Sequence, residues 1–292
     1  MPKPKEKLIV SALALSGWLT IFTTVGILFI LIFESSQFFR EVGIWEFLTG
    51  TQWTPLFSKK EYGILPLLTA TLLTSVIALL VALPIGLSIA IYLNEYANRK
   101  FRRAIKPMLE VLASVPTVVY GFFALTIITP FLQSFIPGLS GFNSISPGIV
   151  MGIMIIPMIS SLSEDALFAV PKSLRDASYG MGATRFQTVF RVLIPSASSG
   201  IIVSVILAIS RAIGETMIVA IAAGQQPRFT LNPMVPVETI TTYIVQVSLG
   251  DVPRDSMEYR SIFAAGIVLF IITFVMNNVS LWLKRRFHRQ YE

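Results

Sequence analysis

The sequence predicts an all-α integral membrane protein with six transmembrane helices and with both termini in the cytoplasm. Three observations support this fold class. Only 13% of the 292 residues are charged and 54% are hydrophobic, whereas soluble domains carry about 25% charged residues. Six apolar segments are long enough to cross a lipid bilayer. The basic residues between these segments are also unevenly divided between the two sides of the membrane.

The six expected helices are joined by polar segments, of which those at 94–107 and 133–147 are the shortest. The first helix comes after MPKPKEK, which resembles the start of a signal peptide, but its uncharged run is too long and no A-x-A site closes it. We therefore expect a retained anchor. Pro84 and Gly86 should kink the second helix, and Pro116 should break the third. The expected spans are residues 8–33, 64–93, 108–132, 148–162, 196–223 and 261–283.

The distribution of Lys and Arg sets the orientation. With the N-terminus in the cytoplasm, 16 of the 23 basic residues fall in inner segments and six in outer segments, with Arg211 inside a span. This division follows the positive-inside rule. It also explains the net charge of +7, so nucleic-acid binding is not expected. We expect one domain over 1–292, made of a first helix with an outer segment (1–63), a core (64–283) and a basic cytoplasmic tail (284–292).

The composition gives no support for a metal or cofactor site. Cysteine is absent, which excludes disulfides, thiolate metal ligands and a cysteine nucleophile. The one histidine, His288, lies in the basic tail without partner ligands.

Two outer segments have the spacing of short amphipathic helices. Phe38, Val42 and Trp45 share one face, and residues 237–247 repeat the pattern with Val237, Ile240, Ile244 and Val247. Such helices are either connectors that pack on the bundle or a contact surface for an external partner. Trp45 and Trp53 fit an aromatic belt at the membrane interface.

The cytoplasmic connection between the fourth and fifth helices is unusually long and is patterned as helix, turn, helix. Bundle connections are commonly about 2–8 residues, whereas this one runs through SEDALFAVPKSLRDASYGMGATRFQTVFRVLIPSA. Leu167, Val170, Leu174 and Ala177 keep a helical period, and GMGATRF interrupts it. A second helical face then leads into Pro195. The connection is therefore expected to be a compact projecting unit.

This loop resembles the EAA loop of bacterial ABC-importer permeases. The family motif reads E-A-A, three residues, G, nine residues, I-x-L-P. Here the same spacing joins Asp176-Ala177-Ser178, Gly182 and Val192-x-Ile194-Pro195. The resemblance implies a coupling helix that enters a groove on an ATP-binding subunit. Asp176 and Ala177 would shape the approach, and the facing residues would be Tyr179, Gly180, Met181, Gly182, Ala183 and Thr184. The alternative is a hairpin that only packs on the bundle.

The chain does not carry an ATPase motif of its own. No G-x-x-x-x-G-K-[ST] occurs, and GMGATR lacks the lysine that a phosphate-binding loop requires. The chain is therefore not expected to be an enzyme, and energy would come from a separate subunit.

A pair of charges lies in the middle of the fifth expected helix. Placing an arginine there costs about 2.5–3.5 kcal/mol on insertion scales, so Arg211 should face the bundle or a wet cavity. Glu215, at i+4 on a continuous helix, would point the same way, and Gly214 would leave room for a neighbour or a solute. Either the two charges brace the bundle, or Arg211 is an anion site that Glu215 holds when the path is empty.

Two further stretches are similar to the phosphate-specific transport (Pst) permeases: RAIGET at 211–216 and VPTVVYGFFAL at 115–125. The continuation MIVAI favours the PstC type. This resemblance implies a multi-pass protein of the bacterial inner membrane that imports phosphate, with Arg211 and Glu215 important for transport. Its partners would be a second permease of PstA type, two ATP-binding subunits and an external phosphate-binding protein. Alternatives are a permease for sulfate or molybdate, a self-sufficient secondary anion carrier or channel, or a membrane sensor.

Overall fold

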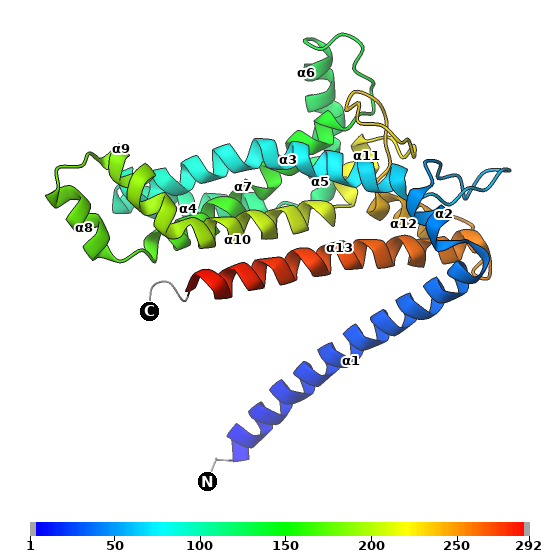
Figure 1. Ribbon diagram of the computed structural model, residues 1–292, viewed down its shortest axis with the longest axis horizontal. Coiled ribbons are helices and arrows are strands. Elements are labelled where there is room, and N and C mark those ends of the chain that lie inside the picture. Colours follow the sequence, from blue (N-terminus) through cyan, green and yellow to red (C-terminus); the bar gives the residue numbers. More distant parts are fainter. Residues whose placement is uncertain (1–3, 289–292) are drawn as a thin grey trace.

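A computed structural model describes residues 4–288 and shows an all-helical bundle (Figure 1). Five helices are long and apolar enough to cross a membrane, and one bent pair brings the number to six if it is a single span. The helices are α1 (Pro4–Glu41), α2 (Ile44–Thr49), α3 (Leu65–Ile91), α4 (Arg99–Ser114), α5 (Thr117–Phe123), α6 (Thr129–Gln133), α7 (Ile145–Phe168), α8 (Lys172–Gly180), α9 (Arg185–Thr188), α10 (Ile194–Ile213), α11 (Met217–Ala222), α12 (Ile240–Leu249) and α13 (Met257–His288). Short π-helical turns occupy Tyr92–Tyr96, Ala124–Ile128 and Val189–Leu193.

The third expected span is the bent one. Residues Lys100–Ser114 and Thr117–Gln133 meet at 85°, and Pro116 caps the second of these segments. Proline cannot donate the backbone hydrogen bond that would continue the helix, so the break expected at Pro116 is confirmed. Pro84 acts differently, because α3 continues through it without ending.

Helices α3 and α7 form the centre of the bundle and pack closely through glycine. A Cβ added at Gly152 would lie 2.7 Å from Val81 Cβ and 2.8 Å from the Ala78 carbonyl oxygen. Gly86 and Gly148 make similar approaches across the same pair of helices. Small residues at such contacts let membrane helices gain van der Waals packing that larger side chains would prevent.

An aromatic cluster closes the outer end of the bundle. Phe38, Phe47 and Trp53 are each at most 1% exposed, and they pack edge-on against one another and against Tyr62 and Tyr243. The expectation that Trp53 belongs to an interfacial belt is therefore wrong, because its ring is part of this core.

The two outer segments differ in how they use their apolar faces. Phe38 and Val42 are buried, but α1 extends through Phe38 to Glu41, and Trp45 is 79% exposed. In the second segment α12 forms as expected, and Ile240 and Val247 are buried.

Helix α1 leaves the rest of the bundle along its length. Figure 1 shows it beside the outer end of α13 and diverging from it toward the N-terminus. None of its most apolar window is buried by other parts of the chain. This position suits a helix that contacts lipid. At the other end, the expected tail 284–292 continues α13 as far as His288, and residues 289–292 lie outside the described residues.

The close packing of α3 on α7 makes Gly152 sensitive to size. Gly152→Leu should lower the free energy of unfolding by about 1–3 kcal/mol, because the added atoms meet the Ala78 backbone. Thermal unfolding of the detergent-solubilised protein would measure this loss. Gly26→Leu is the matched control, since no atom lies within 4 Å of its added Cβ. Equal melting temperatures for the two variants would contradict this packing.

Candidate functional site

The fifth span ends earlier than the sequence suggests. Helix α10 stops at Ile213, Gly214 caps it, and a separate helix α11 begins at Met217. The expected continuous helix over 196–223 is therefore wrong. Because Glu215 lies in the break, the i,i+4 spacing does not bring it beside Arg211. No ion pair joins these two residues in the part of the chain that the structure describes.

Glu215 is buried and faces the start of α11. Its Oε1 accepts hydrogen bonds from the backbone N–H of Met217 at 3.1 Å and of Ile218 at 3.3 Å. Its backbone carbonyl accepts a bond from Thr241 Oγ1 at 2.8 Å. The first N–H groups of a helix have no partner within the helix, and a carboxylate there also suits the helix dipole. Glu215 therefore fixes α11 and ties the break to α12.

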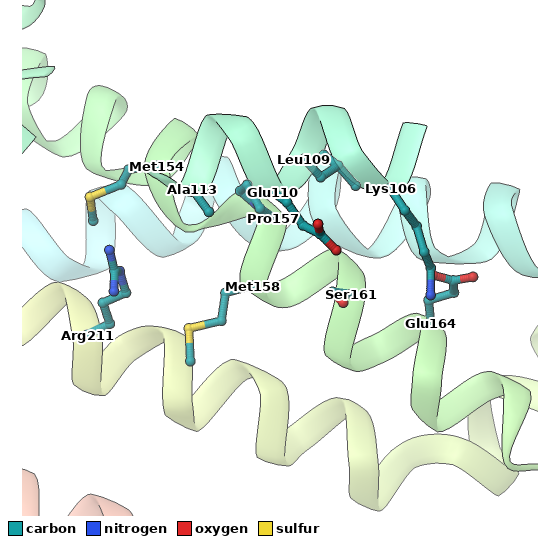
Figure 2. A pocket seen from close by; sticks show the side chains of 10 residues that line it. All are labelled: Lys106, Leu109, Glu110, Ala113, Met154, Pro157, Met158, Ser161, Glu164 and Arg211. Carbon is teal, nitrogen blue, oxygen red and sulfur yellow. The ribbon is translucent and has the colours of Figure 1, made fainter. Parts of the chain in front are cut away.

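Arg211 is exposed in this chain and reaches into a cavity of about 320 Å³. Figure 2 shows its guanidinium rising from α10 toward Met154 on α7. Gly214 is also exposed, and only its own helical turn lies within 4 Å of a Cβ added there. The cavity lies between α4, α7 and α10 and is lined by Lys106, Leu109, Glu110, Ala113, Met154, Pro157, Met158, Ser161, Glu164 and Arg211.

The cavity carries both signs of charge along its length. Arg211 lies at one end, Glu110 points inward from α4, and Lys106 and Glu164 lie at the other end (Figure 2). Glu110 is exposed and forms no ion pair or hydrogen bond with another described residue. A guanidinium with its donors directed into open space is suited to bind an oxyanion.

Glu164 is a charged residue of this cavity that sequence reasoning missed. Its side chain is 1% exposed and lies 2.5 Å from Arg102 Nε and 2.9 Å from Lys106 Nζ. The sequence interpretation placed SEDALF in the inner connection, whereas α7 continues through it to Phe168. The signal available in the sequence was an acidic residue in helical register with α7, which would face the basic start of α4.

The expected helix–turn–helix unit is present at the inner end of the bundle. Helix α8 ends at Gly180, Gly182 adopts a positive φ of 81°, and Thr184 caps α9 in a reciprocal capping box with Gln187. Glycine adopts this backbone conformation without the strain that a Cβ would cause.

The tip of this unit is open to solvent. Met181 is 89% exposed. Six further residues that the sequence singled out are also exposed: Asp176, Ala177, Tyr179, Gly180, Gly182 and Thr184. Ala183 is half-buried.

Four side chains fasten α8 to the π-helical turn that continues α3, and we call this set the latch. Arg175 Nη2 lies 2.9 Å from Glu95 Oε1 and donates a hydrogen bond to Asn94 Oδ1 at 3.0 Å. The Tyr179 hydroxyl donates to Glu95 Oε2 at 3.2 Å. Burial and the nearby Glu95 carboxylate raise the pKa of Tyr179. These contacts therefore couple the position of α8 to that of the turn that continues α3.

A second cavity, of about 460 Å³, lies at the outer end between Trp53, the loop 225–228 and α12. Glu238 lines it and is 1% exposed, and its Oε1 has no hydrogen-bond partner among the described residues. Burial raises the pKa of Glu238 to about 8.

The chain thus has five helices long and apolar enough to span a membrane, a bent sixth segment, an inner projecting unit and a charged cavity between its helices. The chain belongs to the family of binding-protein-dependent transport system inner membrane components, which matches residues 82–290. It is thus a multi-pass protein of the cytoplasmic membrane.

Known relatives extend over most of the chain. The probable ABC transporter permease protein YqgH of Bacillus subtilis is 34% identical, covering 97% of this chain and 91% of that protein. The phosphate transport system permease protein PstC of Mesorhizobium japonicum is 32% identical, covering 82% and 78%. PstC of Haemophilus influenzae is 31% identical, covering 92% and 89%.

Solved transporters share the fold. A bacterial alginate ABC transporter, in complex with an alginate pentasaccharide-bound periplasmic protein, matches with a TM-score of 0.64 at 19% identity, covering 97% of this chain and 96% of that chain. An inward-facing MetNI methionine ABC transporter matches with a TM-score of 0.57 at 18% identity, covering 77% and 94%.

The burial of Glu238 predicts a pH dependence of stability. Its folded pKa of about 8 lies above the ordinary value of 4.5, so the folded state holds a proton that the unfolded state has lost between these values. The contribution of Glu238 to the free energy of unfolding is therefore fully present below pH 4.5 and is lost as the pH rises through 8. Glu238→Gln should reduce the fall in melting temperature between pH 5 and pH 8. The exposed Glu46→Gln variant should keep the wild-type fall, and an equal fall in both variants would contradict the assignment.

Proposed function

We propose that this chain is the permease subunit, of PstC type, of an ATP-driven importer that moves inorganic phosphate into the cytoplasm. The proposal is carried by one observation: Arg211, which has no ion-pair partner among the described residues, presents its guanidinium to a cavity in the middle of the bundle. Relatives named as PstC, at 29–32% identity, add the substrate. The complete importer would contain a second permease of PstA type, two ATP-binding subunits and an external phosphate-binding protein.

In this proposal Arg211 meets the anion directly. A charged donor binds an oxyanion through charge-assisted hydrogen bonds, which are about twice as strong as neutral ones. Glu110, free in the same cavity, keeps the local charge low, so that the anion binds weakly enough to leave.

Glu215 has a different role from the one suggested by sequence spacing. It holds the break at Gly214 in place through its bonds to Met217 and Ile218, which keeps Arg211 at the end of α10 and turned toward the cavity. The contribution of Glu215 to transport is therefore a positioning one.

The exposed tip around Met181 and Gly182 would dock in the ATP-binding subunit, with Asp176 and Ala177 at its approach. The latch then carries the motion of α8 into α3, and α3 packs closely on α7, which lines the cavity. Force from nucleotide binding would reach the anion through packed helices without a flexible tether.

Replacing Arg211 tests the anion site. Arg211→Ala should lower phosphate uptake by proteoliposomes that hold the full complex by about 10- to 100-fold, since a hydrogen bond to a charged group contributes roughly 1.5–3 kcal/mol. Arg211→Lys keeps the charge without the planar donor fork, so its phosphate uptake should lie between that of the wild type and that of Arg211→Ala. Arg191→Ala, on the exposed inner surface, is the control. Unchanged uptake by Arg211→Ala would refute the role. Stronger competition by sulfate or molybdate than by unlabelled phosphate would transfer the proposal to that oxyanion.

The latch makes a separate prediction about coupling. Arg175→Glu places a second carboxylate opposite Glu95, so it should lower the amount of phosphate moved per ATP hydrolysed. The exchange Glu95→Arg with Arg175→Glu restores opposite charges at the same positions and should recover most of that ratio. Measuring uptake and hydrolysis on the same proteoliposomes gives the ratio. If the single variant keeps the wild-type ratio, the latch does not transmit the motion.

A further inference from the structure

A further, strongly basic cavity lies at the inner end of the bundle, next to the cavity that contains Arg211. Its volume is about 560 Å³, and it lies where α4, α7 and the start of α8 meet. Four cations and one aromatic ring line it: Arg102, Arg103, Lys106, Lys172 and Phe168. The positive-inside rule explains basic residues on this side of the membrane, but it does not require four of them to line one cavity.

The buried Glu164 gives this cavity a fixed geometry. One carboxylate holds both Arg102, at 2.5 Å, and Lys106, at 2.9 Å, while those two side chains remain 30% and 35% exposed. Arg102 also lies over the Phe168 ring, 5.1 Å from its centroid. Two cations are therefore held in place by one buried carboxylate, and both of their side chains line the cavity.

The other two cations have no internal partner. Arg103 and Lys172 are exposed and form no ion pair or hydrogen bond with another described residue. The nearby carboxylates are Glu164 and Asp165, and Asp165 is 3.7 Å from Lys106. Four cations against two carboxylates leave an excess positive charge directed into the cavity.

This cavity adjoins the one that contains Arg211, because Lys106 lines both. An anion moving inward from Arg211 would reach Lys106 before the solvent. Figure 2 shows Lys106 and Glu164 at the inner end of that first cavity.

We propose that the inner basic cavity is a second oxyanion site, which takes a group of the phosphate type at the cytoplasmic mouth. Two arginines offer planar donor forks and two lysines offer point charges, a combination that suits a phosphate oxygen cluster. The group is either free inorganic phosphate or the headgroup phosphate of an anionic lipid, since both present the same chemistry. This site goes beyond the proposed importer function and does not depend on transport.

The test uses the complete complex, free of nucleotide and without the external binding protein, in nanodiscs of phosphatidylcholine. Equilibrium binding of radiolabelled inorganic phosphate is measured in the Arg211→Ala background, which removes the first cavity's arginine. The test variant adds Arg103→Gln and Lys172→Gln, and so leaves the Glu164 cluster intact. The control adds Lys100→Gln and Arg191→Gln, which remove the same charge from exposed inner positions outside the cavity.

Phosphate should bind saturably in the Arg211→Ala background and in the control, and about tenfold or more weakly in the test variant, because two of the four cations that line the cavity are removed. A second arm uses nanodiscs of phosphatidylglycerol and counts retained lipid by native mass spectrometry. Fewer retained lipids in the test variant alone identify a headgroup as the occupant. The proposal is overturned if neither phosphate nor lipid retention differs between test and control variants. No uptake is measured, so this outcome is independent of the importer function.

Discussion

A charge inside a bilayer must be paired or wetted, and the break between α10 and α11 resolves this constraint differently for two neighbouring residues. Glu215 turns inward and is satisfied by the N–H groups of Met217 and Ile218, which have no partner within α11. Arg211 remains at the end of α10 and faces a cavity. If the helix were continuous, the two charges could neutralise each other and Arg211 would have little left to offer a solute. The break therefore separates a carboxylate that is satisfied inside the protein from a guanidinium that lines the cavity.

The other buried carboxylates follow the same logic at the inner end of the bundle. Glu164 holds Arg102 and Lys106, and Glu95 holds Arg175 and Tyr179. Removing water from a carboxylate is costly unless it is paired and hydrogen-bonded, so each of these residues fixes the position of its cations. In this way the chain joins α8 to the turn that continues α3, and the basic start of α4 to α7. The glycine contacts between α3 and α7 let the two helices pack closely together.

Much of this architecture could be predicted from the sequence, because hydrophobic length and basic asymmetry are direct consequences of the bilayer. The inner helix–turn–helix unit was also predictable, because its two helical faces and the glycine between them are local features of the sequence. The break at Gly214 was not, because GET within an apolar run has no proline and reads as helix. Its cause is tertiary: the Thr241 hydroxyl and the α11 N–H groups satisfy Glu215 from outside α10. Trp53 and Glu164 were missed because Tyr243, which packs on Trp53, and Arg102 and Lys106, which pair with Glu164, lie far away in the sequence.

The separation of Arg211 from Glu215 is most directly tested by a double-mutant cycle on stability. Thermal unfolding would be compared for the wild type, Arg211→Gln, Glu215→Gln and the double variant in the same detergent. The account predicts a larger loss for Glu215→Gln than for Arg211→Gln, because the neutral amide weakens two charge-assisted hydrogen bonds, and it predicts effects that add within about 0.5 kcal/mol. A coupling energy of about 1 kcal/mol or more would show that the two side chains hold each other, and would contradict the assignment of Arg211 to the cavity.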